Sequence, residues 1–278
     1  MKILVTGSTG FIGSHLVSYM LKNTSHEIVA TGSNLKKAQT KEWFSKVLFI
    51  KADLSQKKQW FKIFKNPDVL IHLSWSNLPN YDKSFHLSKN LSNEIFFLDS
   101  MIDNGLKKLI VTGTCYEYGF QSGCLKESDP TFPKNPYAIA KDSLRRYLEF
   151  KTDGIVFKWL RLFYMYGSGQ NKNSLFSQLN EAIDKKLEFF NMSGGNQIRD
   201  FLPISKVVEL ITKVSFENDS SEIYNICSGN PQRLVDLVNT YIKNSKSNIK
   251  LNLGYYPYSE FEPMEFWGCN KKTSHLLK

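Results

Sequence analysis

The chain has 278 residues, of which 41% are hydrophobic and 22% are charged. That length can bury the core of one large domain or two unequal ones, and the composition excludes a disordered or fibrous protein. The formal net charge is +10, but the lysines are spread along the sequence, so the charge does not indicate a nucleic-acid partner. A basic surface would still attract multiply charged anions.

The first thirteen residues predict a phosphate-binding turn. A short apolar run over residues 2–6 is typical of a buried strand, and residues 14–21 have the apolar spacing of a helix. Between them, Gly7 would make the tight turn, Gly10 would allow close approach of a pyrophosphate, and Gly13 would allow close packing of helix on strand. The alternative is an ordinary strand–turn–helix, but this context favours a dinucleotide at the positive end of the helix.

The end of the second strand indicates which dinucleotide binds. Residues 26–31 form that strand, and Gly32 follows where an acidic residue normally accepts from the ribose 2′-hydroxyl of NAD. No carboxylate stands there, and Lys36 and Lys37 come shortly after. We therefore predict NADP(H), whose 2′-phosphate would be attracted by these cations. The alternative is that the two lysines belong to a solvated loop.

The remaining elements alternate in type along the first part of the chain. The pattern predicts further strands at 47–50, 68–73, 108–112 and 154–161, and helices at 56–65, 85–104 and 138–150. Such alternation predicts an α/β protein with a Rossmann-type, doubly wound parallel sheet.

After residue 167 the pattern changes. Helices are expected at 174–186, 206–216 and 234–243, with strands at 197–201 and 222–226. We predict a dinucleotide-binding domain over residues 1–167 that also carries the catalytic residues. A smaller α/β substrate-binding lobe would span residues 168–278, either consecutive with the first domain or interleaved with it.

Two residues on one helix suggest proton-transfer chemistry. Tyr137 and Lys141 are four residues apart and therefore share a helix face. A nearby ammonium lowers the pKa of a phenol, so Tyr137 could exchange a proton with a carbinol oxygen near neutral pH. The hydroxyl of Thr114, which follows the strand at 108–112, would point into the same crevice.

These pieces, taken together, resemble the extended short-chain dehydrogenase/reductase group, which includes nucleotide-sugar epimerases, dehydratases and 4-ketoreductases. The resemblance covers nearly the whole chain in order. Its matching parts are residues 7–13, 53–54, 72–74, 90, 112–119, 137–141, 160–167, 199–201 and 225–229.

The resemblance implies roles for particular residues. Thr114, Tyr137 and Lys141 would be the catalytic set, with Lys141 also holding the nicotinamide ribose and Asp53 meeting the adenine. The cofactor would contact Gly7, Thr9, Gly10, Phe11, Ile12, Gly13, Ser33, Lys36, Asp53, Leu54, Leu73, Ser74 and Lys141. The substrate would contact Thr114, Tyr116, Tyr164, Arg199 and Glu262, with Arg199 on its diphosphate.

Departures from the group narrow the expected reaction. The dehydratases carry Asp-Glu where this chain has Cys115 and Tyr116, and the epimerases usually carry an NAD-binding acid where it has Gly32. We therefore predict NADPH-dependent reduction of a nucleotide-linked 4-keto-6-deoxyhexose, most simply dTDP-linked, in bacterial surface-polysaccharide biosynthesis. A 4-epimerase and a non-catalytic dinucleotide-binding module are the alternatives.

The partners and compartment follow from the same data. The four cysteines lack CxxC spacing and the five histidines lack metal-ligand spacing, so we expect reduced thiols and no metal. The sequence also predicts a cytoplasmic protein, since residues 3–5 are too short for a signal peptide and no apolar stretch could span a membrane. By analogy of fold, helices 85–104 and 138–150 would form the interface of a homodimer.

Overall fold

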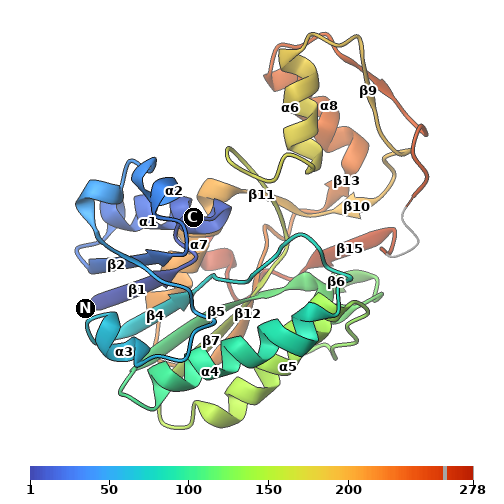
Figure 1. The fold of residues 1–278 in the computed structure, drawn as a ribbon. Helices are drawn as coiled ribbons and strands as arrows, with labels where there is room; N and C mark the ends of the chain where they lie inside the picture. The colour runs from blue at the N-terminus through green and yellow to red at the C-terminus, as the bar shows by residue number, and fades with distance from the viewer. Residues whose placement is uncertain (259–261, 278) are drawn as a thin grey trace.

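The computed structural model describes residues 1–258 and 262–277, and it contains a larger lobe built on one parallel sheet and a smaller lobe beside it (Figure 1). The strands of the large sheet lie in the order β12 (Glu222–Ile226), β7 (Val156–Leu162), β5 (Lys108–Thr114), β4 (Val69–His72), β1 (Lys2–Thr6), β2 (Glu27–Gly32) and β3 (Leu48–Lys51). Every neighbouring pair in this order is parallel. The predicted doubly wound α/β fold is confirmed.

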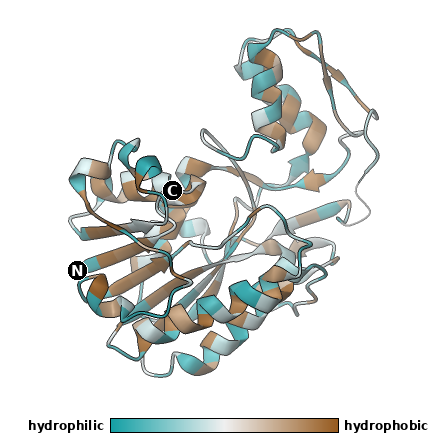
Figure 2. Cartoon of the chain, in the orientation of Figure 1, coloured by the Kyte–Doolittle hydropathy of each residue, from teal (hydrophilic) through white to brown (hydrophobic). Residues whose placement is uncertain are grey.

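Helices cover both faces of this sheet because its strands are apolar on both sides (Figure 2). In β1, Ile3 and Val5 face a core shared with α1 (Phe11–Asn23), α2 (Leu35–Gln39) and α7 (Ile204–Phe216). Leu4 faces the opposite core, which is shared with α3 (Trp60–Ile63), α4 (Leu91–Ile102) and α5 (Pro136–Lys151).

The smaller lobe has its own core. It lies between α6 (Leu175–Asp184), α8 (Leu234–Asn244) and the parallel pair β9 (Phe189–Asn191) and β14 (Lys250–Asn252). Two further sheets lie between the lobes: β13 (Gln232–Arg233), β10 (Ile198–Arg199), β15 (Glu265–Gly268) and β6 (Gly123–Leu125), and the pair β11 (Phe201–Pro203) and β8 (Tyr164–Tyr166).

The lobes are interleaved along the chain. Helix α7 and strand β12, which the sequence placed in the smaller lobe, return to the large sheet, where β12 extends the edge beside β7. The apolar face of α7 completes the core under α1. The boundary at residue 167 stays a prediction, in the interleaved form that the sequence left open. None of the described helices is long and apolar enough to cross a bilayer.

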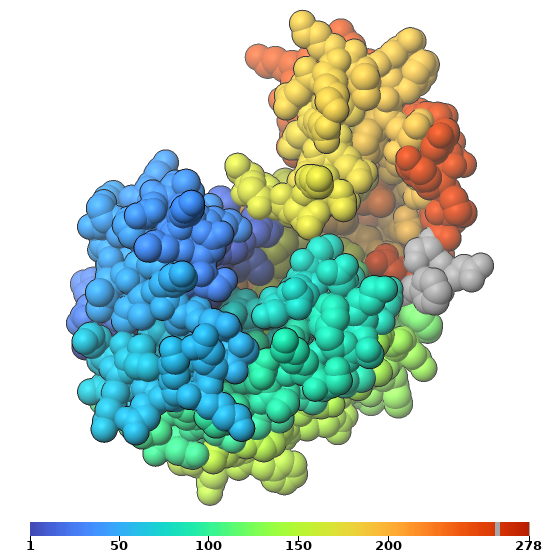
Figure 3. Space-filling model, in the orientation of Figure 1, coloured from blue at the N-terminus to red at the C-terminus, as the bar shows by residue number. Residues whose placement is uncertain are grey.

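A cleft of about 1060 Å³ runs between the two lobes, over the carboxyl ends of the parallel strands. Figure 3 shows the hollow between the blue N-terminal part and the yellow residues of the α6 region. Ligands of open α/β sheets bind at this end of the strands.

Candidate active site

The glycine turn has the geometry of a dinucleotide cradle. Gly7 has φ of +64°, which favours glycine, and its backbone lies against the loop after β4. A Cβ at Gly13 would lie 2.3 Å from the Gly7 carbonyl oxygen, so helix α1 can approach β1 this closely only without a side chain there. Gly10 lines the cleft, and a Cβ there would meet only that same oxygen, at 3.1 Å. The turn therefore fits a pyrophosphate at the start of α1.

The corner beyond β2 differs from the prediction by one residue. Gly32, Ser33 and Lys37 line the cleft, whereas Lys36 does not. The Asn34 side chain accepts from the Lys37 N–H at 2.9 Å and starts the short helix α2. Successive residues on a helix point about 100° apart, so only one of the two lysines can face the cleft.

The remaining predicted cofactor residues lie along the same wall of the cleft. Asp53 accepts from the backbone and hydroxyl of Ser55 at 3.1 and 2.7 Å, and the hydrogen bonds of Ser55 lower the pKa of its carboxyl. The other lining residues from the predicted set are Thr9, Phe11, Ile12, Leu54, Leu73 and Ser74.

Two of the three predicted catalytic side chains line the cleft. Thr114 ends β5, and Tyr137 is the second residue of α5. Helix α5 starts sharply because Asn135 caps it at 2.9 Å from the Ala138 N–H and Pro136 occupies its first position. The sequence predicted that Lys141 would lower the pKa of the Tyr137 phenol, but burial raises this pKa, and Tyr81 and other neighbours add to that effect. The phenol therefore keeps its proton in the free protein.

Lys141 lies behind the cleft wall. Its ammonium donates to the Thr112 carbonyl oxygen at 2.8 Å and stands 4.2 Å from the ring centroid of Trp75. Burial lowers its pKa to about 8. Trp75 lines the cleft and Lys141 does not, and the contact of Lys141 with the nicotinamide ribose stays a prediction.

A buried carboxylate fixes the backbone of Thr114. Glu117 accepts from the Thr114 N–H at 2.8 Å, from the Trp159 indole N–H at 3.0 Å and from Arg161 Nε at 2.8 Å. The Glu117 and Arg161 side chains are almost completely buried. Burial raises the pKa of the Glu117 carboxyl, while the Arg161 guanidinium acts in the opposite direction. The sequence prediction gave Glu117 no role, although it lies three residues after the catalytic threonine.

The predicted diphosphate contact of Arg199 does not appear in the geometry. Arg199 is buried and pairs with Glu262 at 3.1 Å, and it also donates to the carbonyl oxygens of Ile198 and Met264. It does not line the cleft, whereas Glu262, Tyr116 and Tyr164 do. Tyr116 donates to Glu262 at 3.3 Å. Arg199 thus orients Glu262, and its contact with the substrate diphosphate stays a prediction.

Cys115 has no acid or base character here. Its thiol is buried next to Tyr116, and burial raises its pKa, with Glu262 and Glu117 adding to that effect. The pKa of the Tyr116 phenol is likewise well above its usual value because the ring is buried. Neither side chain can act as the carboxylates expected at these positions of a dehydratase.

The N-terminus of α6 forms a part of the cleft that the sequence prediction missed. Asn171, Asn173 and Ser174 line the cleft where this helix begins. Their polar side chains and the free N–H groups of a helix start suit an anion. The asparagine-rich run before the helix was the available signal.

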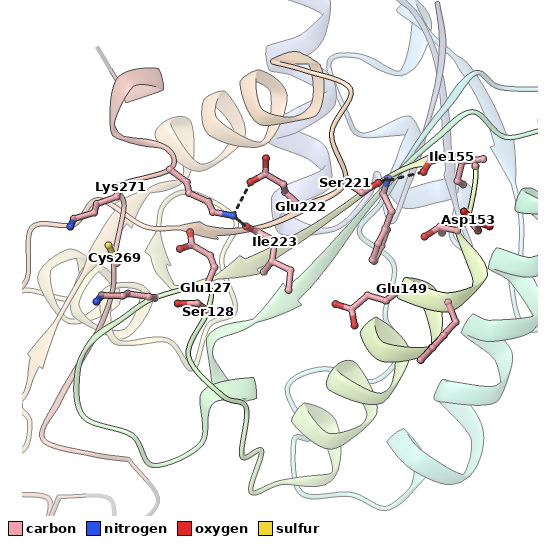
Figure 4. A pocket seen from close by; sticks show the side chains of 16 residues that line it. Glu127, Ser128, Glu149, Asp153, Ile155, Ser221, Glu222, Ile223, Cys269 and Lys271 are labelled. Carbon is pink, nitrogen blue, oxygen red and sulfur yellow. Dashed lines mark hydrogen bonds and ion pairs between the residues drawn. The ribbon is translucent and has the colours of Figure 1, made fainter.

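A second hollow of about 1010 Å³ lies at the amino ends of β7 and β12, away from the cleft (Figure 4). It is bounded by the end of α5, the starts of β7 and β12, and residues 269–272. Lys272 pairs there with Glu222 at 2.8 Å. None of the predicted site residues lines it, so the chemistry belongs to the cleft between the lobes.

The parallel sheet, the glycine cradle and the tyrosine–lysine pair at its carboxyl edge define a dinucleotide-dependent α/β enzyme. The residues present fit such a cofactor. The model of the NAD dependent epimerase/dehydratase family matches residues 3–227, and the chain belongs to that family.

The chain is also similar to individual proteins with assigned activities, which supports its place in this family. The chain is 31% identical over 276 residues to dTDP-6-deoxy-L-talose 4-dehydrogenase (NAD(+)) of Aggregatibacter actinomycetemcomitans, covering 97% of this chain and 100% of that protein. It is 28% identical to GDP-6-deoxy-D-talose 4-dehydrogenase of the same organism, covering 82% and 75%. The structure of UDP-glucuronic acid 4-epimerase from Bacillus cereus with NAD superposes with a TM-score of 0.81 at 27% identity, covering 100% and 90%.

Proposed function

We propose that this protein reduces the 4-keto group of a nucleotide-linked 4-keto-6-deoxyhexose, with NADPH as the reductant. Two relatives are named as 4-dehydrogenases of deoxytalose nucleotides, and such a dehydrogenation is this reduction run backwards. The dTDP-linked substrate is our first choice because the more similar of the two acts on a dTDP sugar.

The chain's own groups would manage the carbonyl oxygen and its proton. The Thr114 hydroxyl would hold the 4-keto oxygen by donating to it, and Tyr137 would give that oxygen its proton as the alcohol forms. Lys141 would stabilise the phenolate left behind. When bound, the reduced dinucleotide supplies the hydride.

The observation that supports the proposal is that, among the residues that the structure describes, each carboxylate lining the cleft already has a hydrogen-bond partner. Asp53 lies beside the glycine turn with Ser55, Glu94 bonds His72 at 2.6 Å, and Glu262 bonds both Arg199 and Tyr116. Loss of water from a sugar requires an acid and a base at the reacting carbons. Reduction of a carbonyl with Tyr137 as the proton donor does not require a carboxylate as a second acid or base.

NADPH as the cofactor rests on the corner beyond β2. Gly32 and Lys37 line the cleft there, with no carboxylate at position 32 to repel a 2′-phosphate. The more similar relative is named for NAD(+), and the superposed epimerase holds NAD, so steady-state comparison of NADPH and NADH tests this choice directly.

A 4-epimerase is the second candidate. The similarity to UDP-glucuronic acid 4-epimerase favours it, and the same threonine, tyrosine and lysine could support it. A panel of dTDP-, CDP-, UDP- and GDP-linked 4-keto-6-deoxysugars, with NADPH absorbance as the readout, tests the reductase. Interconversion of UDP-hexoses at constant absorbance would support the epimerase instead.

We also propose that the protein is a homodimer formed through α4 and α5. These helices already act as one surface, because Tyr147 on α5 donates to Asp99 on α4 at 2.7 Å and Lys151 pairs with Asp103 at 2.7 Å. Mass measurement in solution by light scattering tests this proposal.

A further inference from the structure

Trp75 packs against the rings of Tyr137 and His86, yet the proposed reaction gives it no part. It comes three residues after the end of β4 and lines the cleft. Its ring lies 4.2 Å from the Lys141 ammonium and meets the Tyr137 ring edge-on at 5.8 Å. One indole thus contacts both members of the tyrosine–lysine pair.

The indole is held in this position by a hydrogen-bonded histidine. Trp75 Nε1–H donates to His86 Nδ1 at 3.0 Å, so that nitrogen must be an acceptor. His86 Nε2–H then donates to the Asn80 carbonyl oxygen at 2.9 Å. The Asn90 amide also lies 3.2 Å from His86 Nδ1, and His86 is completely buried. These contacts fix the neutral tautomer of His86 and, with it, the plane of the indole.

The contact between Trp75 and Lys141 compensates for the burial of the ammonium. The Thr112 carbonyl oxygen accepts one of its three N–H bonds, and the Trp159 ring lies 5.9 Å away on another side. A desolvated ammonium is stabilised by the negative face of an indole, and burial makes that attraction stronger than at a surface.

We propose that Trp75 is a positioning residue that keeps the Lys141 ammonium charged on the helix face that Lys141 shares with Tyr137, with His86 setting the indole plane. The kinetic part of this inference rests on the proposed function, and the binding part does not. Trp75 acts on the reaction only through Lys141, since the charged lysine is what stabilises the tyrosine after proton transfer.

Several other ionisable groups face the same lysine and must be separated from Trp75 in any test. Glu94 and Glu117 raise the pKa of Lys141, and burial, the larger effect, lowers it. Glu94 lies on α4, where it bonds His72, and Glu117 follows β5; His86 and Tyr137 both contact the Trp75 ring. The Trp75 substitutions leave all of them in place.

A fluorescence titration tests the contact without any turnover. The tryptophan emission of the wild type should change with a midpoint near pH 8, because the ammonium beside Trp75 loses its proton there. Lys141→Met should abolish that step, and Trp75→Phe should reduce it to the smaller contribution of Trp159, whose ring lies 5.9 Å from the same ammonium. Trp267→Leu, which changes a tryptophan that does not line the cleft, should retain it. A wild-type step that survives in Lys141→Met would overturn the inference.

The pH profile of kcat/KM gives the kinetic test. Reduction needs Lys141 protonated, so activity is present below the pKa of Lys141 and falls as the pH rises through it. Trp75→Leu should move that alkaline limb down by about one pH unit, and Trp75→Phe, which keeps a weaker π face, by less. If Trp75 had only a structural role, its substitution would lower kcat/KM without moving the alkaline limb of the pH profile. That result would contradict the proposed role of Trp75. If the wild type reduces no 4-keto sugar, the proposed function fails, while the titration still decides the role of Trp75.

Discussion

At the scale of single residues, burial moves the two partners of the proton-transfer pair in opposite directions. It raises the pKa of Tyr137 and lowers that of Lys141. A phenol that keeps its proton until an anion is about to form on the substrate is suited to be the acid in a reduction. The charge of Lys141 then contributes most as the phenolate appears.

Tyr137→Phe should lower kcat about 100- to 10,000-fold, because it removes the proton donor and keeps the ring. Binding of the dinucleotide, followed by fluorescence, should be unchanged, since the ring still packs against Trp75 and Tyr81. Tyr241→Phe on α8 is a matched control that should keep full turnover. Near-normal turnover of Tyr137→Phe would remove this residue from the mechanism.

The ribose corner makes a second residue-level prediction. Lys37→Ala should raise the KM for NADPH several-fold and leave that for NADH unchanged, whereas Lys36→Ala should change neither, because only Lys37 lines the cleft. Gly32→Asp should shift preference toward NADH, since its carboxylate would repel a 2′-phosphate. The added Cβ would meet only the Thr9 side chain, at 3.1 Å. Equal effects of the two lysine variants would contradict this assignment.

At the scale of elements, two glycines of the turn between β1 and α1 serve different purposes: Gly13 is needed for packing, and Gly10 is needed for dinucleotide binding. Gly13→Ala should destabilise the protein by about 1–3 kcal/mol, because its Cβ would overlap the backbone of Gly7 and Ser8. Gly10→Ala should retain most of the stability and weaken dinucleotide binding, because the new methyl would occupy space beside the cleft. Urea denaturation measures the stability of each variant, and calorimetric titration measures its dinucleotide binding. If the two variants behaved identically, the separate roles assigned to Gly10 and Gly13 would be wrong.

The buried ion pair of Glu117 and Arg161 stabilises the fold and also holds the backbone of Thr114 in the site. Glu117→Gln should lower the free energy of unfolding by about 3–5 kcal/mol, because Arg161 would be left buried without a counter-charge. Glu181→Gln, in the exposed pair with Lys185 on α6, is the control and should not shift the unfolding transition. A Glu117→Gln transition equal to the wild type would show that the pair does not hold this part of the fold.

The sequence predicts regular elements well and small ones poorly. Long periodic segments such as α5 and β5 are found because their apolar spacing is strong. Strands of two or three residues, such as β10 and β8, have no period to read and exist only through their partners. The return of β12 to the large sheet follows from packing against β7, which no local pattern encodes.

The same limit applies to the site. The glycine turn and the pair Tyr137 and Lys141 were recognisable because their chemistry depends on spacing along the chain. The ion pair of Arg199 with Glu262 was not foreseen because the two residues are distant in sequence, and the position of Trp75 over Lys141 depends on the path of the loop after β4.

At the scale of the whole molecule, the cleft between the lobes brings together groups from distant parts of the chain. The larger lobe contributes the glycine cradle, Thr114 and Tyr137, while the start of α6 and Glu262 contribute the other wall. A dinucleotide on the first wall and a nucleotide sugar on the second would place their reacting ends beside Tyr137. This arrangement is the structural basis of the proposed reductase.

The decisive test of the proposed 4-keto reduction is incubation of the protein with dTDP-4-keto-6-deoxyhexose and NADPH, with NADPH absorbance and sugar product followed together. One NADPH should be oxidised for each 4-hydroxy sugar formed, and both signals should be lost in Tyr137→Phe. Conversion of a UDP-hexose into its 4-epimer with no NADPH consumed, and no reduction of any 4-keto sugar, would contradict it.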